Sequence, residues 1–161
     1  MEAARVMAIM VLQFLATLLF AMVAGSVFGI WRGYDPGPYA ATTFLEVHQG
    51  AVRGLNTLLP GLAVISILLT IALLWFARGK GMTFWLYAGA LSLMVAGGVI
   101  TRLFNQPINV QVITWTIDAL PSNWTALRSS WWDWHILRTG LSVAALALLL
   151  AAVIADRPYL R

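Results

Sequence analysis

The sequence contains no cysteine and few charged residues, and both absences narrow what the protein can be. Without cysteine, disulfides, thiolate metal sites and cysteine nucleophiles are excluded. Charged residues make up only 10% of the 161 residues and hydrophobic residues 61%, whereas soluble domains are roughly 45 to 50% apolar. The net charge of +4 comes without a basic run, so nothing indicates nucleic-acid binding. The composition predicts an integral membrane protein whose surroundings are a lipid bilayer.

Four apolar runs are long enough to cross a hydrocarbon core, which needs about 20 residues per helix. We expect spans at approximately 6–30, 55–77, 82–103 and 131–155, all in one domain covering 1–161. The last apolar run begins only at Thr139, so its helix should start upstream and bring Asp133, His135 and Arg138 to the membrane boundary. The first run exceeds the core of a signal peptide, about 7 to 15 residues, so we expect a retained helix. The sequence therefore predicts an all-α, four-helix membrane bundle with a polar, Trp-rich loop region near one interface.

The connections between these spans indicate an orientation. Gly79 and Gly81 flank Lys80 in a tight connection, so the second and third spans should form an antiparallel hairpin. The side of this hairpin and the termini carries Arg5, Arg78, Lys80, Arg157 and Arg161. The long loops on the other side contain arginines together with carboxylates, so the positive-inside tendency favours cytoplasmic termini. In the first long loop we expect Thr42 to be an N-cap from which a helix runs into the second span.

Polar side chains gather in residues 102–138, between the third and fourth spans. Polar groups at membrane depth are costly unless they serve packing or chemistry, so we place the working site here. Ser122 and Asn123 provide a start signal for the fourth helix. On that helix, residues at spacing i, i+3, i+7 and i+10 share one face. They are Arg128, Trp131, His135 and Arg138.

A second polar stripe approaches the same interface from the segment before the second span. It consists of Glu46, Gln49, Arg53 and Asn56. The third span adds Thr101, Arg102 and Asn105, and Asn109 follows one turn later if the helix continues through Pro107. We expect a carboxylate, guanidiniums, an imidazole and amides to form one satisfied network, as buried polar groups require. Such a network is either a ligand site or a structural tie between the long loops and the bundle.

The chain has two histidines. His135 lies near Arg128 and Arg138, so we expect a neutral imidazole that either accepts a proton or serves as a structural hydrogen-bonding group. His48 shares a helical face with Val52, away from the Glu46 stripe, so we expect it to face a neighbouring helix or lipid. His48 and His135 together could ligate a haem or a metal, and their separation decides this alternative.

Ala21, Gly25 and Gly29 form a small-residue stripe in the first span. Such stripes permit close helix approach. Packing within the bundle is the expected use, and a homo-oligomer is the alternative.

Three segments of the sequence resemble the bacterial branch of the anthrone oxygenase-like membrane proteins, and the resemblance covers most of the chain. The segments are HQGAVRGLNTLLP, ITRLFNQPINVQVITW and PSNWTALRSSWWDWHILRT. Their most specific elements are NQPIN at residues 105–109 and the pattern of Trp131, His135 and Arg138. The resemblance implies a compact four-helix protein of a bacterial inner membrane. Its named fungal members oxidise anthrones to anthraquinones without an evident cofactor, so none is predicted here.

The same resemblance suggests roles for individual residues. His135 would remove a proton from the acidic CH2 group of a hydrophobic aromatic substrate, giving an enolate that reacts with dioxygen. Arg138, Arg102 or Asn105 would stabilise the oxyanion. The predicted substrate-binding residues are Trp115, Trp131, Asn109, Gln49, Arg53, Asn56 and Arg128. The family is expected to have glutamine at the position of His48, so any role of His48 would be particular to this chain. The alternatives are a haem- or quinone-binding membrane protein and a structural subunit of a membrane complex.

Overall fold

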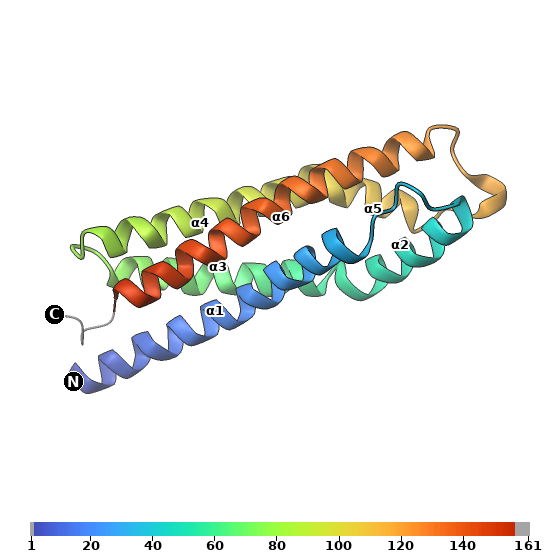
Figure 1. The fold of residues 1–161 in the computed structure, drawn as a ribbon. Helices are drawn as coiled ribbons and strands as arrows, with labels where there is room; N and C mark the ends of the chain where they lie inside the picture. Colours follow the sequence, from blue (N-terminus) through green and yellow to red (C-terminus); the bar gives the residue numbers. More distant parts are fainter. Residues whose placement is uncertain (1, 157–161) are drawn as a thin grey trace.

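The computed structural model describes residues 2–156, so Arg157 and Arg161, two of the basic residues that favour cytoplasmic termini, lie outside the described residues. The described chain forms an elongated helical bundle (Figure 1). Its helices are α1 (Glu2–Gly33), α2 (Ala41–Leu55), α3 (Leu58–Phe76), α4 (Met82–Ile100), α5 (Gln106–Val112) and α6 (Trp124–Ala155). Between them lie a π-helical turn, η1 (Thr101–Asn105), and a 3-10 turn, η2 (Ile117–Ala119).

Four helical units within residues 2–156 are long and apolar enough to cross a membrane. They are α1, the α2–α3 unit (Ala41–Phe76), the unit from α4 to α5 (Met82–Val112) and α6. The predicted all-α, four-helix membrane fold is therefore confirmed, and the chain is an integral membrane protein. Each unit extends beyond its apolar run, because the polar residues at its ends continue the helix.

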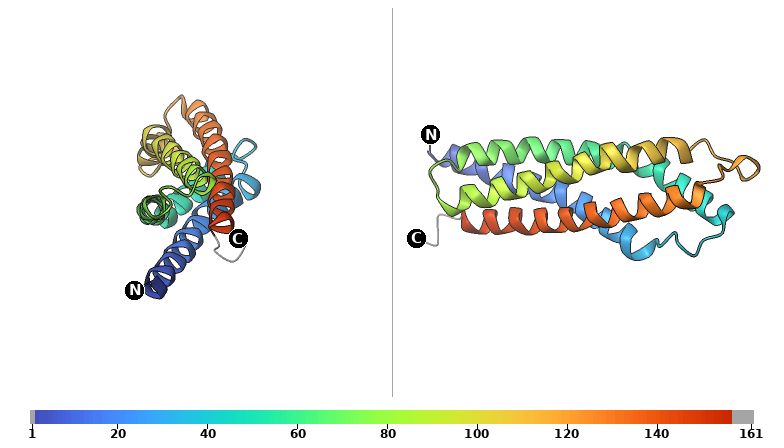
Figure 2. Two further views of the ribbon diagram at one scale, coloured as in Figure 1. Left: turned by 90° about the vertical axis from the view of Figure 1, so that its left-hand side faces the viewer. Right: turned by 90° about the horizontal axis from the view of Figure 1, so that it is seen from above.

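The bundle has two different ends. At one end the α3–α4 hairpin turns through Gly79 and Gly81, whose positive φ angles of 81° and 54° favour glycine. The start of α1 and the end of α6 lie at this same end, whereas α2, α5 and the long loops lie at the other (Figure 1). Helix α4 packs along α6 and α1 packs along α3. Figure 2 shows α1 inclined to the remaining helices.

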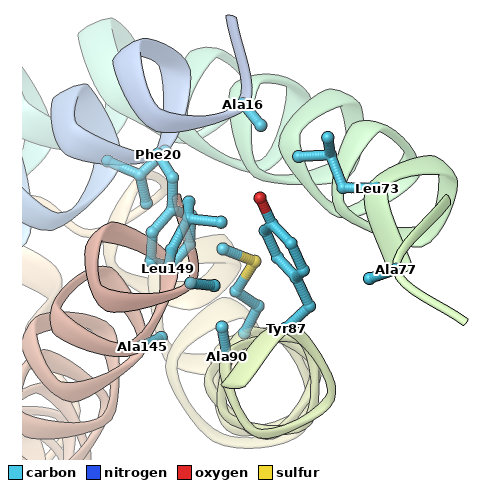
Figure 3. Packing of buried hydrophobic residues seen from close by; sticks show 11 residues of the cluster. Ala16, Phe20, Leu73, Ala77, Tyr87, Ala90, Ala145 and Leu149 are labelled. Atoms are coloured by element: carbon cyan, nitrogen blue, oxygen red, sulfur yellow. The ribbon is translucent and has the colours of Figure 1, made fainter. Parts of the chain in front are cut away.

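An apolar core closes the hairpin end of the bundle. The ring of Tyr87 on α4 is fully buried among side chains of α1, α3 and α6, including Phe20, Leu73 and Leu149 (Figure 3). The hydroxyl of Tyr87 accepts a hydrogen bond from Gln13 Nε2 at 3.1 Å. Gln13 also donates to Asp156, which pairs with Lys80 in the one salt bridge found among residues 2–156. Polar contacts therefore join α1, α6 and the hairpin at this end.

The helix before α5 passes through Pro107 without ending. Proline removes a backbone N–H and clashes with the preceding turn of an α-helix. Here the π turn Thr101–Asn105 widens the helix just before the proline, with the Gln106 N–H bonded to the carbonyl of Thr101. Local π turns of this kind allow a helix to continue past an irregularity. Asn105 and Asn109 are consequently carried on one continuous unit and are both buried.

The predicted helix start at Thr42 is wrong. Helix α2 begins at Ala41, with Ala40 in the N-cap position and no side-chain capping bond. The reason is the extended backbone at Ala40, where φ is −61° and ψ is 157°, so the chain already turns into the helix before Thr42. At the other loop, α6 begins at Trp124 with Asn123 in the N-cap position, as the sequence predicted.

Candidate functional site

A cavity of about 770 Å³ lies between all four spanning units. Its volume falls within the range of small-molecule sites, about 300 to 1,000 Å³. Much of its wall is apolar, with contributions from Phe20, Val27, Leu59, Ala63, Ile67 and Met94. Polar side chains form the rest, notably Tyr34, His48, Asn56, Asn109, Trp131 and Arg138. An apolar cavity with a few converging polar groups is typical of a site for a hydrophobic ligand.

The cavity opens sideways between α3 and α4. Val64 of α3 and Val95 and Val99 of α4 line it and are 55%, 45% and 48% exposed, which indicates that the wall is open at these residues. Arg102 lies on the same part of the wall and is exposed as well. In a membrane-spanning bundle this outer surface faces lipid, so the opening gives a lipid-soluble molecule a route into the cavity.

Four side chains from four elements form a hydrogen-bonded chain on the cavity wall. The Tyr34 hydroxyl, in the loop after α1, lies 3.1 Å from Nδ1 of His48 on α2. Nε2 of His48 lies 3.3 Å from Oδ1 of Asn109 on α5. That oxygen also accepts a hydrogen bond from Trp131 Nε1 of α6 at 2.8 Å. These hydrogen bonds join α2, α5, α6 and the first loop at the polar end of the cavity.

The contact with Trp131 determines the direction of these hydrogen bonds. The indole N–H can only donate, so the amide oxygen of Asn109, and not its nitrogen, must face Trp131. The amide nitrogen of Asn109 correspondingly donates to Oδ1 of Asn56 at 2.8 Å. His48 therefore meets an acceptor with its Nε2, which must carry the hydrogen. In a neutral imidazole Nδ1 is then the acceptor, and Tyr34 donates its hydroxyl hydrogen to it.

Gln106 holds the backbone of Asn56 because Pro60 leaves the carbonyl of Asn56 free. Pro60 has no N–H, which leaves the carbonyl of Asn56 without its usual helical partner. Gln106 Nε2 donates to this carbonyl at 3.3 Å. The start of α3 and the proline-containing unit of α5 are thus tied together beside the cavity.

Arg138 lines the cavity from α6 and binds the imidazole of His135. Its guanidinium donates to His135 Nδ1, with Nη2 at 2.9 Å and Nε at 3.2 Å, and Nη1 donates to the hydroxyl of Thr101 at 3.2 Å. Since Nδ1 accepts these bonds, a neutral His135 carries its hydrogen on Nε2, which donates to the carbonyl of Val27 at 3.0 Å. His135 is 0% exposed and is absent from the cavity wall. It lies behind Arg138 and sets the orientation of the guanidinium.

The predicted carboxylate is missing from this network. Glu46 is exposed on α2, and no salt bridge of Arg138 is found within residues 2–156. The prediction failed because the α2 stripe divides across the helix. Gln49 and Asn56 turn toward α5, whereas Glu46 and Arg53 remain at the surface.

The structure separates the predicted site residues into two groups. Those that line the cavity are Arg138, Arg102, Trp131, Asn109 and Asn56. Those that do not are His135, Asn105, Trp115, Gln49, Arg53 and Arg128.

Each residue of the second group contacts other parts of the protein. Asn105 donates to the carbonyl of Trp131, and Gln49 donates to the carbonyls of Val112 and Trp115. Arg53 donates to Gln49. Arg128 donates to the carbonyl of Tyr39 and lies over the ring of Trp124, near the start of α6. These side chains hold the long loops against the helices, which was the structural alternative for the polar stretch.

Two cavity residues were not among the catalytic and substrate-binding residues predicted from the sequence. His48, expected to face a neighbour or lipid, is 1% exposed and lies on the cavity wall. Of the two alternatives, the neighbouring helices are the correct one, because His48 contacts Asn109 of α5 and Trp131 of α6. Helical spacing alone shows which residues share a face but not which face meets the other helices. Tyr34 follows the last residue of α1, in a turn segment with no periodicity, and no sequence signal identified it.

The two histidines are poorly arranged to ligate a haem or metal. Trp131 contacts both imidazoles, edge-on to His48 at 4.6 Å between ring centroids and stacked on His135 at 5.0 Å. Every ring nitrogen of the pair already takes part in a hydrogen bond. A ligand bond to either histidine would break one of these contacts. Among residues 2–156 no group of three or more metal-ligating side chains was found.

Comparison with known proteins assigns a family to this architecture. A family model described as anthrone oxygenase matches residues 49–148. The chain belongs to the anthrone oxygenase family. The residues that match the family model include Asn56, Asn109, Trp131 and Arg138, whereas Tyr34 and His48 precede the matched region. No curated protein sequence and no solved structure matches this member of the anthrone oxygenase family.

Proposed function

We propose that this member of the anthrone oxygenase family binds a flat, hydrophobic aromatic ketone of the anthrone type and oxidises it with dioxygen, without a bound cofactor. The observation that carries the proposal is the guanidinium of Arg138. It lies on the wall of a largely apolar cavity and is held by an imidazole and a hydroxyl in place of a carboxylate. The family is established by residues 49–148, and the bacterial inner membrane with cytoplasmic termini is the proposed setting.

A cation in such a position favours an anionic ligand. Burying a charge without an opposite charge is costly, and a bound anion would offset that cost. A guanidinium has five N–H donors, and the bonds from Nε, Nη1 and Nη2 of Arg138 leave further donors for a ligand. An anthrone becomes such an anion when its CH2 group loses a proton, because the charge moves onto the carbonyl oxygen.

The proposed reaction needs no further oxidant. Loss of a C–H proton gives the enolate, whose carbon transfers electrons to dioxygen and forms a C–O bond. Protonation of the resulting peroxide gives a hydroperoxide. Loss of the second C–H proton from that carbon, with cleavage of the O–O bond, yields a carbonyl group and one molecule of water. Arg138 would stabilise the enolate oxygen, as preorganised donors do for developing oxyanions.

A quinone carrier is the second candidate. The lateral opening between Val64 and Val95 would admit a membrane quinone as readily as an anthrone. Arg138 could equally donate to a quinone oxygen. The two candidates differ in whether dioxygen is consumed.

The test is oxygen uptake by the purified full-length protein in detergent with anthrone as substrate, corrected for oxidation in protein-free detergent. Uptake that saturates with anthrone and yields anthraquinone supports the oxygenase. A rise in melting temperature with anthrone or a quinone but no uptake above the blank would replace it with the carrier. If the protein shows neither oxygen uptake nor a shift in melting temperature, the cavity is rejected as a site for this class of ligand.

A further inference from the structure

We propose that Tyr34 and His48 form the proton-accepting pair of this site. The hydroxyl oxygen of Tyr34 takes the proton that the substrate loses, while its own hydrogen passes to Nδ1 of His48. This inference rests on the proposed oxidation and identifies its base. It assigns the role to a residue pair outside the region that matches the family model.

The hydrogen-bond directions leave His48 with one basic atom, and that atom faces Tyr34. Trp131 forces the oxygen of Asn109 toward His48, so Nε2 of His48 carries the hydrogen and Nδ1 carries the lone pair. Nδ1 lies 3.1 Å from the Tyr34 hydroxyl. When Nδ1 gains a proton, the Nε2–H bond to Asn109 is retained. The imidazolium would therefore form without rearrangement of its partners.

Tyr34 is placed to pass a proton between the cavity and His48. Both residues line the cavity, yet His48 is only 1% exposed and its acceptor nitrogen is covered by the Tyr34 hydroxyl. A hydroxyl that donates one hydrogen still has lone pairs to accept another. Burial raises the pKa of Tyr34, so the hydroxyl keeps its proton until a substrate supplies another.

The proton balance closes over one turnover. A substrate C–H bond breaks and an O–H bond forms on Tyr34, as the previous Tyr34 O–H bond breaks and an N–H bond forms on His48. The pair then returns this proton to the terminal oxygen of the peroxide. It accepts the second C–H proton when the O–O bond breaks, and gives that proton to the departing hydroxide as water. Tyr34 and His48 end in their starting protonation states.

His135 is less suited to this role. Its acceptor nitrogen is occupied by Arg138 and its other nitrogen by the carbonyl of Val27, and it does not reach the cavity. We therefore assign separate roles to these residues. Arg138 stabilises the anion, His135 positions Arg138, and Tyr34 with His48 moves the proton.

The experiment measures enolate formation alone, by stopped-flow absorbance under anaerobic conditions, with anthrone and the purified full-length protein. Tyr34→Phe removes the hydroxyl but keeps the ring, and His48→Gln removes the base. Each should slow enolate formation on the order of a hundredfold, the usual range for loss of a general base. Tyr39→Phe is the matched control, because Tyr39 lies 5.6 Å from Tyr34 between ring centroids but does not line the cavity. It should behave as the wild type.

The outcomes separate this inference from the proposed function. If wild-type protein oxidises anthrone and folded Tyr34→Phe forms the enolate at the wild-type rate, the proton pair is wrong and the oxygenase stands. If wild-type protein neither forms the enolate nor takes up oxygen, both fail. His48→Ala with added imidazole gives a second readout, because rescue of the rate would show that a missing base, and not a damaged fold, caused the loss. Absence of rescue in a folded variant would count against His48 as the base.

Discussion

Arg138 and His135 form a pair in which the guanidinium donates to Nδ1 of the imidazole at 2.9 Å. The carbonyl of Val27 on α1 accepts from the opposite nitrogen of the ring and fixes its tautomer. A buried arginine usually faces a carboxylate, which neutralises it. A neutral imidazole holds the side chain in position while leaving its charge for a ligand. We therefore expect the pair to make the cavity selective for anions.

Arg138→Ala should remove the preference of the cavity for anions. We expect the affinity for an anionic anthrone analogue, such as a polycyclic phenolate, to fall by about a hundredfold, because a lost charge-assisted hydrogen bond is worth about 1.5 to 3 kcal/mol. The affinity for a neutral polycyclic hydrocarbon should change little. Fluorescence titration of both ligands at one pH provides the measurement.

Arg53→Ala is the matched control, since Arg53 is exposed and its one described partner is Gln49. It should leave both affinities unchanged. If Arg138→Ala and Arg53→Ala bind the phenolate equally well, the guanidinium does not contact the ligand.

The fold was predictable from the sequence because hydropathy acts over whole segments. Four apolar runs and the turn at Gly79 and Gly81 were enough to predict four helices and a hairpin. Pro107 left one question open, because only the structure shows the π turn that carries the helix past it.

The site was predictable only in part. Spacing on α6 correctly grouped His135 with Arg138, but it could not show that one lies on the cavity wall and the other behind it. His48 shares a helical face with apolar residues of α2, so the sequence left open whether it meets a neighbouring helix or lipid. The residues that cover it belong to distant parts of the chain. Tyr34 lies in an irregular loop, where no periodic signal exists. Tertiary contacts decide these three positions.

We expect Tyr34 to lower the stability of the protein at alkaline pH. Burial raises its pKa above the usual value of 10.0, with a smaller contribution from Tyr39 in the same direction. The folded state therefore holds the proton more tightly than the unfolded state. The contribution to stability is complete below pH 10 and decreases as the pH rises toward the folded pKa, by about 1.4 kcal/mol per pH unit.

The measurement is the free energy of unfolding of wild-type protein and Tyr34→Phe, in detergent, between pH 8 and pH 11. The difference between the two proteins isolates Tyr34 from the other tyrosines and lysines. The wild type should lose stability faster than the variant above about pH 10. Parallel curves would show that Tyr34 titrates normally and that its hydroxyl is in contact with water.

The proposed topology puts the α3–α4 hairpin on the cytoplasmic side. Arg78 and Lys80 are the charged residues of this connection, and short basic loops stay on the positive side of the membrane. A reporter inserted at residues 78–81 should give a cytoplasmic signal, and one at residues 35–39 an external signal. Because the hairpin and the loop lie at opposite ends of the bundle, the two signals must differ (Figure 1). The opposite pair of signals would reverse the orientation without changing the fold.

His135 distinguishes a positioning residue from a base. If His135 is the base, as the sequence suggested, His135→Gln would lower turnover on the order of a hundredfold or more while the fold stays unchanged. As a positioning residue it needs only an acceptor for Arg138 and a donor for Val27, and glutamine carries one of each. We therefore expect His135→Gln to keep most of the turnover and an unaltered pH–rate profile.

His135→Leu supplies the contrast, because leucine fills similar space but offers neither group. Val27 already bonds within its helix, so the main loss falls on Nε and Nη2 of Arg138, which would lose their acceptor at about 1 to 3 kcal/mol each. We expect a lower melting temperature and weaker binding of the anionic phenolate, with binding of the neutral hydrocarbon retained. A purely structural histidine would lower stability without changing the ratio of the two affinities. A folded His135→Gln variant with turnover a hundredfold below wild type and a changed pH–rate profile would instead restore His135 as the base, and would remove that role from Tyr34 and His48.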